Sequence, residues 1–121
     1  MATFSKSILS QSSNGIPIAV SSTGTNTTLI HTGPTLTTQY DELWLYASNP
    51  TDSDVLLNIL IGGTNFTSNI AFEGVIEAYA GNVLVIPGFI INGTGSVGIE
   101  IKANVSVANG VNILGYVNTI R

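Results

Sequence analysis

The stretch DELWLYASNPTDSDVLLNILIGG, residues 41–63, contains two runs of alternating side chains separated by a segment rich in turn-forming residues. In the first run, small and aliphatic side chains alternate with Trp44 and Tyr46. In the second run, Leu56 and Leu60 alternate with a further set of aliphatic side chains. Successive side chains of a β-strand point to opposite faces of the sheet. The stretch therefore predicts two strands and a turn, with large apolar side chains on both faces of each strand.

The same period of two continues along the chain. Residues 96–107, SVGIEIKANVSV, place apolar side chains on one face and polar ones on the other. In residues 71–81, Glu73 and Glu77 have helical spacing, but Gly74 and its β-branched neighbours favour a strand. About eight short strands separated by turn signals predict one all-β domain, a sandwich or a barrel. The remaining strands are predicted at residues 16–21, 27–31, 39–47, 54–61, 75–79, 83–86 and 111–120.

The first fourteen residues differ from the rest because they are rich in serine and weakly patterned. We predict an N-terminal arm over residues 1–14 and a β-sandwich domain over residues 15–121. The apolar residues with which such an arm would dock on a partner are Phe4, Ile8 and Leu9. We expect this arm to bind a partner and to contribute little to the stability of its own domain.

The composition excludes nucleic-acid binding and favours contact between copies. Of the 121 residues, 8% are charged and three are Lys or Arg, so no basic patch can form. Surface hydroxyls and amides leave water at a smaller cost than ions do, which suits a protein packed against other copies. We predict a subunit interface that includes Trp44, Tyr46, Leu56 and Leu60; the alternative is that the chain's own loops cover them.

No membrane segment, secretory signal or disulfide framework is expected. The longest apolar run, VLVIPGFII at residues 83–91, is interrupted by Pro87 and Gly88 and is half the length of a spanning helix. The chain has no cysteine. Its four Asn-X-Ser/Thr sequons are what a composition rich in these residues produces by chance.

The sequence offers no set of residues for catalysis or for metal binding. His31 is the one histidine, and we interpret it as a turn or interface residue. Asp52 and Asp54 resemble half of a calcium loop, with Asn49 as a third oxygen, but the glycine and the distal glutamate of such a loop are missing. Asp41 and Glu42 are adjacent on a strand and point to opposite faces. We therefore predict no enzyme activity, no cofactor and no metal.

Four phrases together resemble a known group of proteins: GIPIAVSSTGTNTTLIHTG, DELWLYASNPTDSDVLLNILIGGT, VLVIPGFIING and ILGYVNTIR. Between residues 15 and 121 the chain resembles small virion structural proteins of tailed bacteriophages, of the capsid decoration or cement type. The resemblance implies a non-enzymatic, jelly-roll-like β-sandwich that forms a homotrimer on the outer capsid surface. It also implies the major capsid protein as partner and stabilisation of the head shell as function, so that Phe4, Ile8 and Leu9 of the arm would contact the capsid.

Two alternatives remain open at the level of sequence. The first is a tail or fibre component of the virion. The second is a carbohydrate-binding jelly-roll module, in which Trp44, Tyr46 or Tyr79 would stack on sugar rings. Binding to a glycan array would favour the second alternative, whereas cosedimentation with empty capsid shells would favour decoration.

Overall fold

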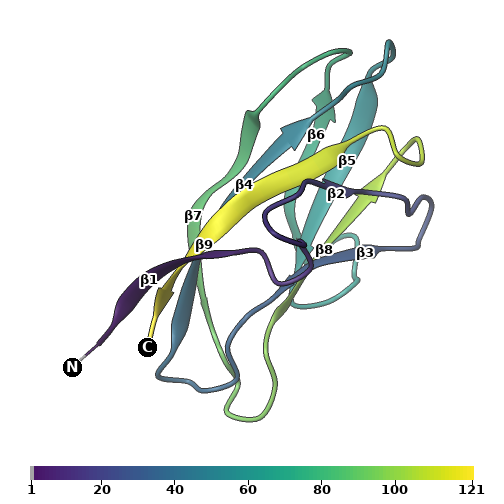
Figure 1. Cartoon of the computed structure of the whole chain (residues 1–121). Coiled ribbons are helices and arrows are strands. Elements are labelled where there is room, and N and C mark those ends of the chain that lie inside the picture. The colour runs from purple at the N-terminus through teal and green to yellow at the C-terminus, as the bar shows by residue number, and fades with distance from the viewer. Residues whose placement is uncertain (1) are drawn as a thin grey trace.

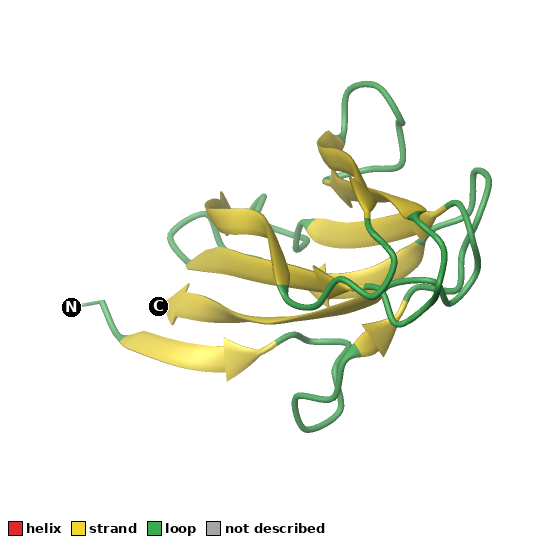
Figure 2. Ribbon diagram, turned by 90° about the horizontal axis from the view of Figure 1, so that it is seen from above, coloured by secondary structure: helices red, strands yellow, loops and turns green. Residues whose placement is uncertain are grey.

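The computed structural model describes residues 2–121, which form a sandwich of two antiparallel sheets (Figures 1 and 2). This confirms the all-β prediction, and no helix occurs in the range described. The strands are β1 (Phe4–Ile8), β2 (Ile18–Ala19), β3 (Thr28–Thr32), β4 (Tyr40–Ser48), β5 (Val55–Ile61), β6 (Ile70–Ile76), β7 (Val83–Asn92), β8 (Glu100–Val105) and β9 (Asn112–Ile120).

The strand order is that of a jelly roll. The five-stranded sheet has the order β1-β9-β4-β7, with β2 also paired to β9, and the four-stranded sheet has the order β3-β8-β5-β6. The pairs are nested: β5 pairs with β6, β4 with β7, β3 with β8, and both β1 and β2 with β9. One long antiparallel hairpin has thus been rolled into two facing sheets, as the jelly-roll expectation requires.

The inner faces of the two sheets form one apolar core. On β4, Leu43, Leu45 and Ala47 alternate with partly exposed residues and have no exposed surface. On β5, Leu57 and Ile59 are likewise fully buried and belong to the same core. The predicted alternation along the opening stretch is therefore correct for the inward set of side chains.

Several strands differ in extent from their predicted ranges; β8, for example, covers Glu100–Val105 where the pattern predicts residues 96–107. Strand β7 continues beyond Ile86 to Asn92, because the chain accommodates Pro87 and Gly88 with shifts of register against β4. Gly88 has a φ of 83°, which side chains other than glycine rarely adopt. Strand β6 begins at Ile70, earlier than predicted, and the strand assignment for this segment is confirmed.

The N-terminal segment is part of the sheet, unlike the arm that the sequence analysis describes. Strand β1 pairs with β9 in an antiparallel register that runs from Phe4 opposite Ile120 to Ile8 opposite Tyr116 (Figure 1). All five of its side chains are exposed, which explains why the apolar pattern does not reveal the strand. Leu9, which follows it, is 1% exposed and lies in the core.

Candidate functional site

The outer face of the five-stranded sheet carries a broad set of apolar side chains. Strand registers place them in rows: Phe4, Ile120 and Tyr40 form one row across β1, β9 and β4, and Ile8, Tyr116 and Trp44 form another. Tyr46 pairs with Leu114 on β9 and with Leu84 on β7. We call this surface the apolar face; its members are Phe4, Ile8, Tyr40, Trp44, Tyr46, Leu84, Ile90, Leu114, Tyr116 and Ile120.

Several of these side chains are strongly exposed. The exposed fraction is 73% for Phe4, 51% for Ile8 and 61% for Ile90. Trp44 and Tyr116 stack on one another, with ring centroids 6.4 Å apart and planes 16° from parallel. Such a pair contributes about 0.5–1.5 kcal/mol beyond the area it buries and makes the centre of the face flat and rigid.

The structure brings together two sets of residues that the sequence analysis treats separately. Phe4 and Ile8, predicted as docking points of the arm, lie on the same face as Trp44 and Tyr46, predicted as interface residues. Leu9 is absent from this face because its side chain is buried in the core. The surface therefore includes two of the predicted docking residues, Phe4 and Ile8, and two of the predicted interface residues, Trp44 and Tyr46.

Leu56 and Leu60 lie elsewhere, on the outer side of the four-stranded sheet. Leu56 is 38% exposed and pairs in register with Val75 on β6. Leu60 has no exposed surface, and it lies in register between Lys102 on β8 and Ile70 on β6. The chain itself covers Leu60, so this residue is not accessible to a partner subunit in the structure.

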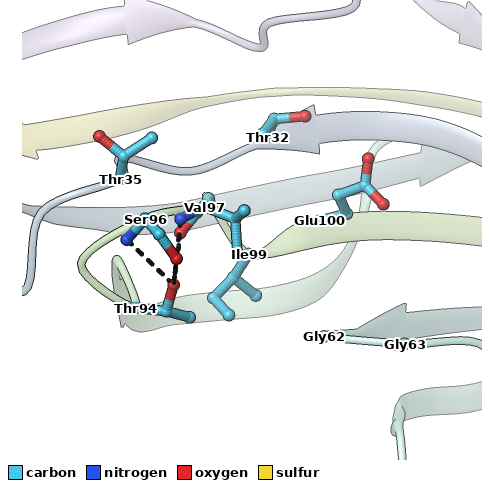
Figure 3. Close-up of a pocket in the computed structure, with 10 residues that line it drawn as sticks. Thr32, Thr35, Gly62, Gly63, Thr94, Ser96, Val97, Ile99 and Glu100 are labelled. Carbon is cyan, nitrogen blue, oxygen red and sulfur yellow. Dashed lines mark hydrogen bonds between the residues drawn. The ribbon is translucent and has the colours of Figure 1, made fainter.

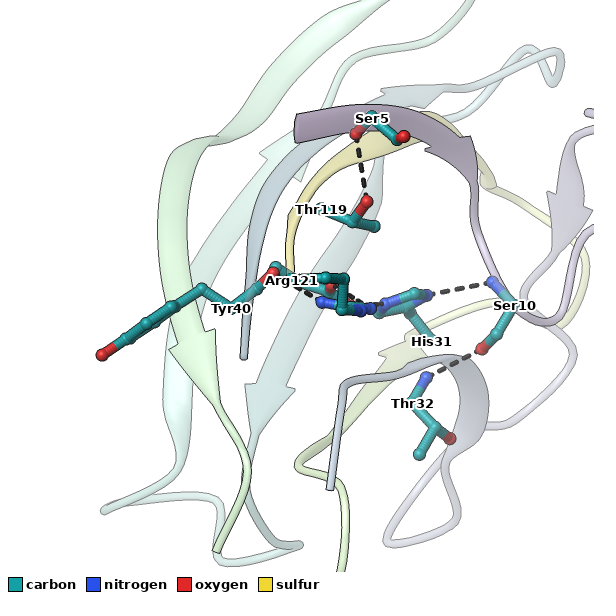
Figure 4. A network of polar contacts seen from close by, with 8 residues as sticks. Ser5, Ser10, His31, Thr32, Tyr40, Thr119 and Arg121 are labelled. Atoms are coloured by element: carbon teal, nitrogen blue, oxygen red, sulfur yellow. Dashed lines mark hydrogen bonds and ion pairs between the residues drawn. The ribbon is translucent and has the colours of Figure 1, made fainter. Parts of the chain in front are cut away.

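A buried polar network joins the two sheets near the chain ends (Figure 4). His31 on β3 donates through Nε2 to Asp41 Oδ2 on β4 at 2.7 Å, and its Nδ1 accepts the Ser10 backbone N–H at 2.9 Å. These partners fix the neutral tautomer with hydrogen on Nε2. Arg121 donates to Asp41 Oδ1 at 3.0 Å and to the Tyr40 carbonyl at 2.8 Å.

This network has the residue types of a Ser-His-Asp triad but not its geometry. Ser10 presents its backbone N–H to His31, and its hydroxyl oxygen accepts a hydrogen bond from the Thr32 backbone N–H. His31 and Asp41 are 4% and 2% exposed. A nucleophile needs its hydroxyl hydrogen-bonded to the imidazole and open to substrate. The arrangement instead fastens the segment after β1 to the body of the sandwich.

The pKa of Asp41 responds to this environment. Burial alone would raise the pKa, but the hydrogen bonds donated by His31 and Arg121, together with the positive charge of Arg121, outweigh burial and lower the pKa of Asp41 below its ordinary value. A depressed pKa means that Asp41 stabilises the fold above its unfolded pKa, and that this stabilisation is lost as the pH falls below about 4.

We expect Asp41→Asn to reduce the free energy of unfolding at pH 7 by about 1.5–3 kcal/mol, because charge-assisted hydrogen bonds are lost. The deficit should shrink as the pH falls from 4 to 3, where the wild-type carboxylate is itself neutralised. Urea unfolding at both pH values measures this effect, and Asp52→Asn, an exposed change, serves as control. A deficit that does not change with pH would contradict the role assigned to the Asp41 charge.

The candidate calcium ligands hold a turn. Asn49 Oδ1 accepts hydrogen bonds from the backbone N–H and the hydroxyl of Thr51, and Asn49 Nδ2 donates to the carbonyls of Ser53 and Ile76. Asp54 accepts the Ala78 backbone N–H. Within residues 2–121, no group of three or more His, Cys, Asp or Glu side chains is placed to hold a metal ion.

A hollow of about 740 Å³ lies between loops of the sandwich (Figure 3). Its lining combines the hydroxyls of Thr32 and Thr35 with the apolar side chains of Val97 and Ile99. The Thr94 hydroxyl, also in the lining, is used within its own loop, where it accepts the Val97 backbone N–H. Glu100, at the rim, is paired with Lys102 at 3.2 Å. No aromatic side chain lines the hollow to stack on a sugar ring.

In comparisons with known proteins, no family model, curated sequence or solved structure matches this chain. Over the part of the chain that the structure describes, no helix has the length and apolar character needed to cross a membrane.

Proposed function

We propose that this protein is a non-enzymatic structural protein of a phage virion, a capsid decoration or cement protein that oligomerises and stabilises the head shell. The observation that carries the proposal is the apolar face. It presents aromatic and aliphatic side chains across β1, β9, β4 and β7 on one side of a sheet whose other side is the core.

A face of this kind favours association. Full burial of one large apolar side chain stabilises a complex by about 1.5–3 kcal/mol, and Phe4, Ile8 and Ile90 are each more than half exposed. Large exposed apolar patches mark interaction sites in soluble proteins. The scarcity of charge removes the repulsion that otherwise keeps copies apart.

The jelly-roll fold and the sequence resemblance support the choice of a virion role. Jelly rolls occur in viral capsid proteins and in lectins, so the fold alone does not decide between them. The apolar face favours subunit contact because its apolar side chains spread across β1, β9, β4 and β7, whereas a small-ligand site gathers its groups in one concave pocket. The assembly that the resemblance implies is a homotrimer on the outer capsid surface, bound to the major capsid protein.

Self-association is tested by light scattering at micromolar concentration. We expect a multiple of the 12.6 kDa chain mass, with a trimer as the proposed state. Ile90→Lys on the apolar face should shift the protein towards monomer, with a dissociation constant at least about tenfold higher. Val75→Lys on the other sheet is the matched control, because Val75 is 57% exposed and Ile90 is 61% exposed. A wild-type protein that stays monomeric would contradict the proposal.

The virion role is tested by cosedimentation with empty capsid shells of the phage that encodes the protein. We expect the wild type to pellet with the shells and to raise their resistance to heat. Binding to a glycan array without binding to shells would replace this function with carbohydrate recognition. Binding to tails or fibres instead of shells would move the protein to the second virion role.

A further inference from the structure

The apolar face contains two charged side chains of opposite sign. Among the described strands of the five-stranded sheet, the charged residues are Lys6, Asp41 and Glu42, and Asp41 is buried on the inner side. Lys6 on β1 and Glu42 on β4 both lie in register with Asn118 on β9, which separates them. Two strand spacings place their backbones about 10 Å apart.

Glu42 is fixed in place and ionised. Its Oε1 accepts the Trp44 indole N–H at 2.7 Å and an Asn118 side-chain N–H at 2.8 Å. These hydrogen bonds hold the pKa of Glu42 below its ordinary value, so the side chain is a carboxylate at neutral pH. Both bonds end on Oε1, which leaves Oε2 as an acceptor for a donor from outside the chain.

Lys6 is exposed on the edge strand, and its ammonium lies over the Tyr116 ring, 4.6 Å from the centroid. The ring occupies one side of the ammonium and leaves donors free. The ion pairs among the described residues join other groups: Arg121 pairs with Asp41, and Lys102 pairs with Glu100. Within residues 2–121, Lys6 and Glu42 thus stand on an apolar surface without an ionic partner.

A hollow of about 360 Å³ lies between these two charges, and its other lining residues are Phe4, Ser5, Asn118 and Ile120. It gives a side chain from another molecule room to reach the Glu42 carboxylate. Its apolar walls are Phe4 on β1 and Ile120 on β9, and the rest of its lining is polar or charged. A long side chain with an apolar stem and a cationic end, such as lysine, has the chemistry that fits this hollow.

We propose that the apolar face packs against a neighbouring copy of this chain so that the Lys6 ammonium of one copy pairs with the Glu42 carboxylate of the other. This inference rests on the self-association proposed above. It names the contact that determines how two copies align across the interface. An acidic partner on this face would pair with Lys6 but would bury Glu42 without a positive partner. A basic partner would pair with Glu42 but would bury Lys6 without a negative one. A second copy supplies both charges, and a buried charge left alone is costly.

The same contact serves a closed pair or a ring. In a pair related by a two-fold axis, two Lys6–Glu42 contacts form reciprocally. In a ring such as a trimer, each copy gives Lys6 to one neighbour and Glu42 to the other. Apolar burial supplies the affinity in both cases, and the charge pair excludes other registers.

The test uses Lys6→Glu and Glu42→Lys, alone and mixed in equal amounts. Each variant alone should self-associate about tenfold or more weakly, because like charges then meet across the interface. Mixing the two should recover association, because the carboxylate that replaces the Lys6 ammonium on one chain then faces the ammonium that replaces the Glu42 carboxylate on the other. The recovery is complete in a closed pair and extends to two of the three contacts in a trimer. Each chain keeps its own like-charged residues in the mixture, so the recovery can come only from contacts between chains. Sedimentation velocity measures both effects.

Lys102→Glu is the matched control, since it makes the same charge change on the four-stranded sheet and should associate as the wild type does. If a charge reversal unfolds the chain, Glu42→Gln is used instead, because its amide oxygen still accepts hydrogen bonds from Trp44 and Asn118. This variant should self-associate more weakly than the wild type, and its self-association should depend less on salt. If the wild type assembles and the variants assemble equally well, the Lys6–Glu42 contact between copies is wrong but self-association stands. A mixture that shows no recovery leads to the same conclusion. A monomeric wild type overturns the pair together with the proposed self-association.

Discussion

Gly115→Ala is expected to cost about 3 kcal/mol or more of the free energy of unfolding. Gly115 lies in the middle of β9, between β1 and β4, with a φ of 147°. A Cβ at this position would overlap the carbonyl oxygen of Trp44 on the neighbouring strand. The backbone conformation and the close approach of β4 both require glycine there.

Gly81→Ala is the control, because a Cβ at Gly81 meets no atom within 4 Å. Its effect should stay within about 0.5 kcal/mol. Urea unfolding of the wild type and both variants measures the difference. If Gly115→Ala were as stable as Gly81→Ala, the close contact between β9 and β4 would have to be wrong, and with it the rows that build the apolar face.

Leu9→Ala is expected to lower the free energy of unfolding by about 2–5 kcal/mol, as removal of a fully buried leucine does. Leu9 is 1% exposed, whereas its neighbour Ile8 is 51% exposed on the apolar face. Ile8→Ala should therefore change the stability of the monomer by less than about 1 kcal/mol. Both variants should be compared at a concentration at which the wild type is dissociated, so that lost subunit contacts do not enter.

The same pair of variants decides between the two descriptions of the N-terminus. An arm that orders only on a partner predicts little loss of stability from either change. An integral strand followed by a core anchor predicts a large loss from Leu9→Ala alone. If both variants lower the free energy of unfolding by equally small amounts, the N-terminal segment is an arm and not an integral strand.

The sequence predicts most strands well because their signals are local. Alternation on β4 and β5, and the turn residues between them, suffice to place both strands within about two residues of their observed ends. Strand β1 escapes this method because none of its side chains is buried. Its stability comes from backbone pairing with β9, at the far end of the chain, and no local pattern reports such a partner.

Only part of the apolar face can be predicted from the sequence, because its signals are also local. Alternation shows that Trp44 and Leu60 each point away from the core, but it does not show which outer face the chain covers by itself. The structure leaves Trp44 on a broad apolar surface and encloses Leu60 completely. A register shift between Ile59 and Leu60 accompanies that enclosure, and an irregularity of this kind leaves no trace in the apolar period.

The partnership of His31 with Asp41 also had a signal in the sequence. Asp41 shares the inward face of β4 with Leu43, and a carboxylate on an apolar face needs a partner. The chain has one histidine, and it stands at the end of the preceding strand. What the sequence could not supply was the third and fourth members, because Arg121 and Ser10 come from the two ends of the chain.

The nested strand pairing has a consequence for the order in which the chain can close. Val55 pairs with Ile76, Ala47 with Val83, Thr28 with Ala103 and Phe4 with Ile120, so each successive pair encloses a longer loop. The entropy lost in closing a loop rises with the length of the loop. Pairing of β5 with β6 therefore loses the least entropy, and pairing of β1 with β9 loses the most. On a ribosome, the residues of β1 emerge before those of β2 to β9, yet their partner β9 is the last of these strands to be made. The edge of the apolar face is therefore completed only after β9 has been synthesised.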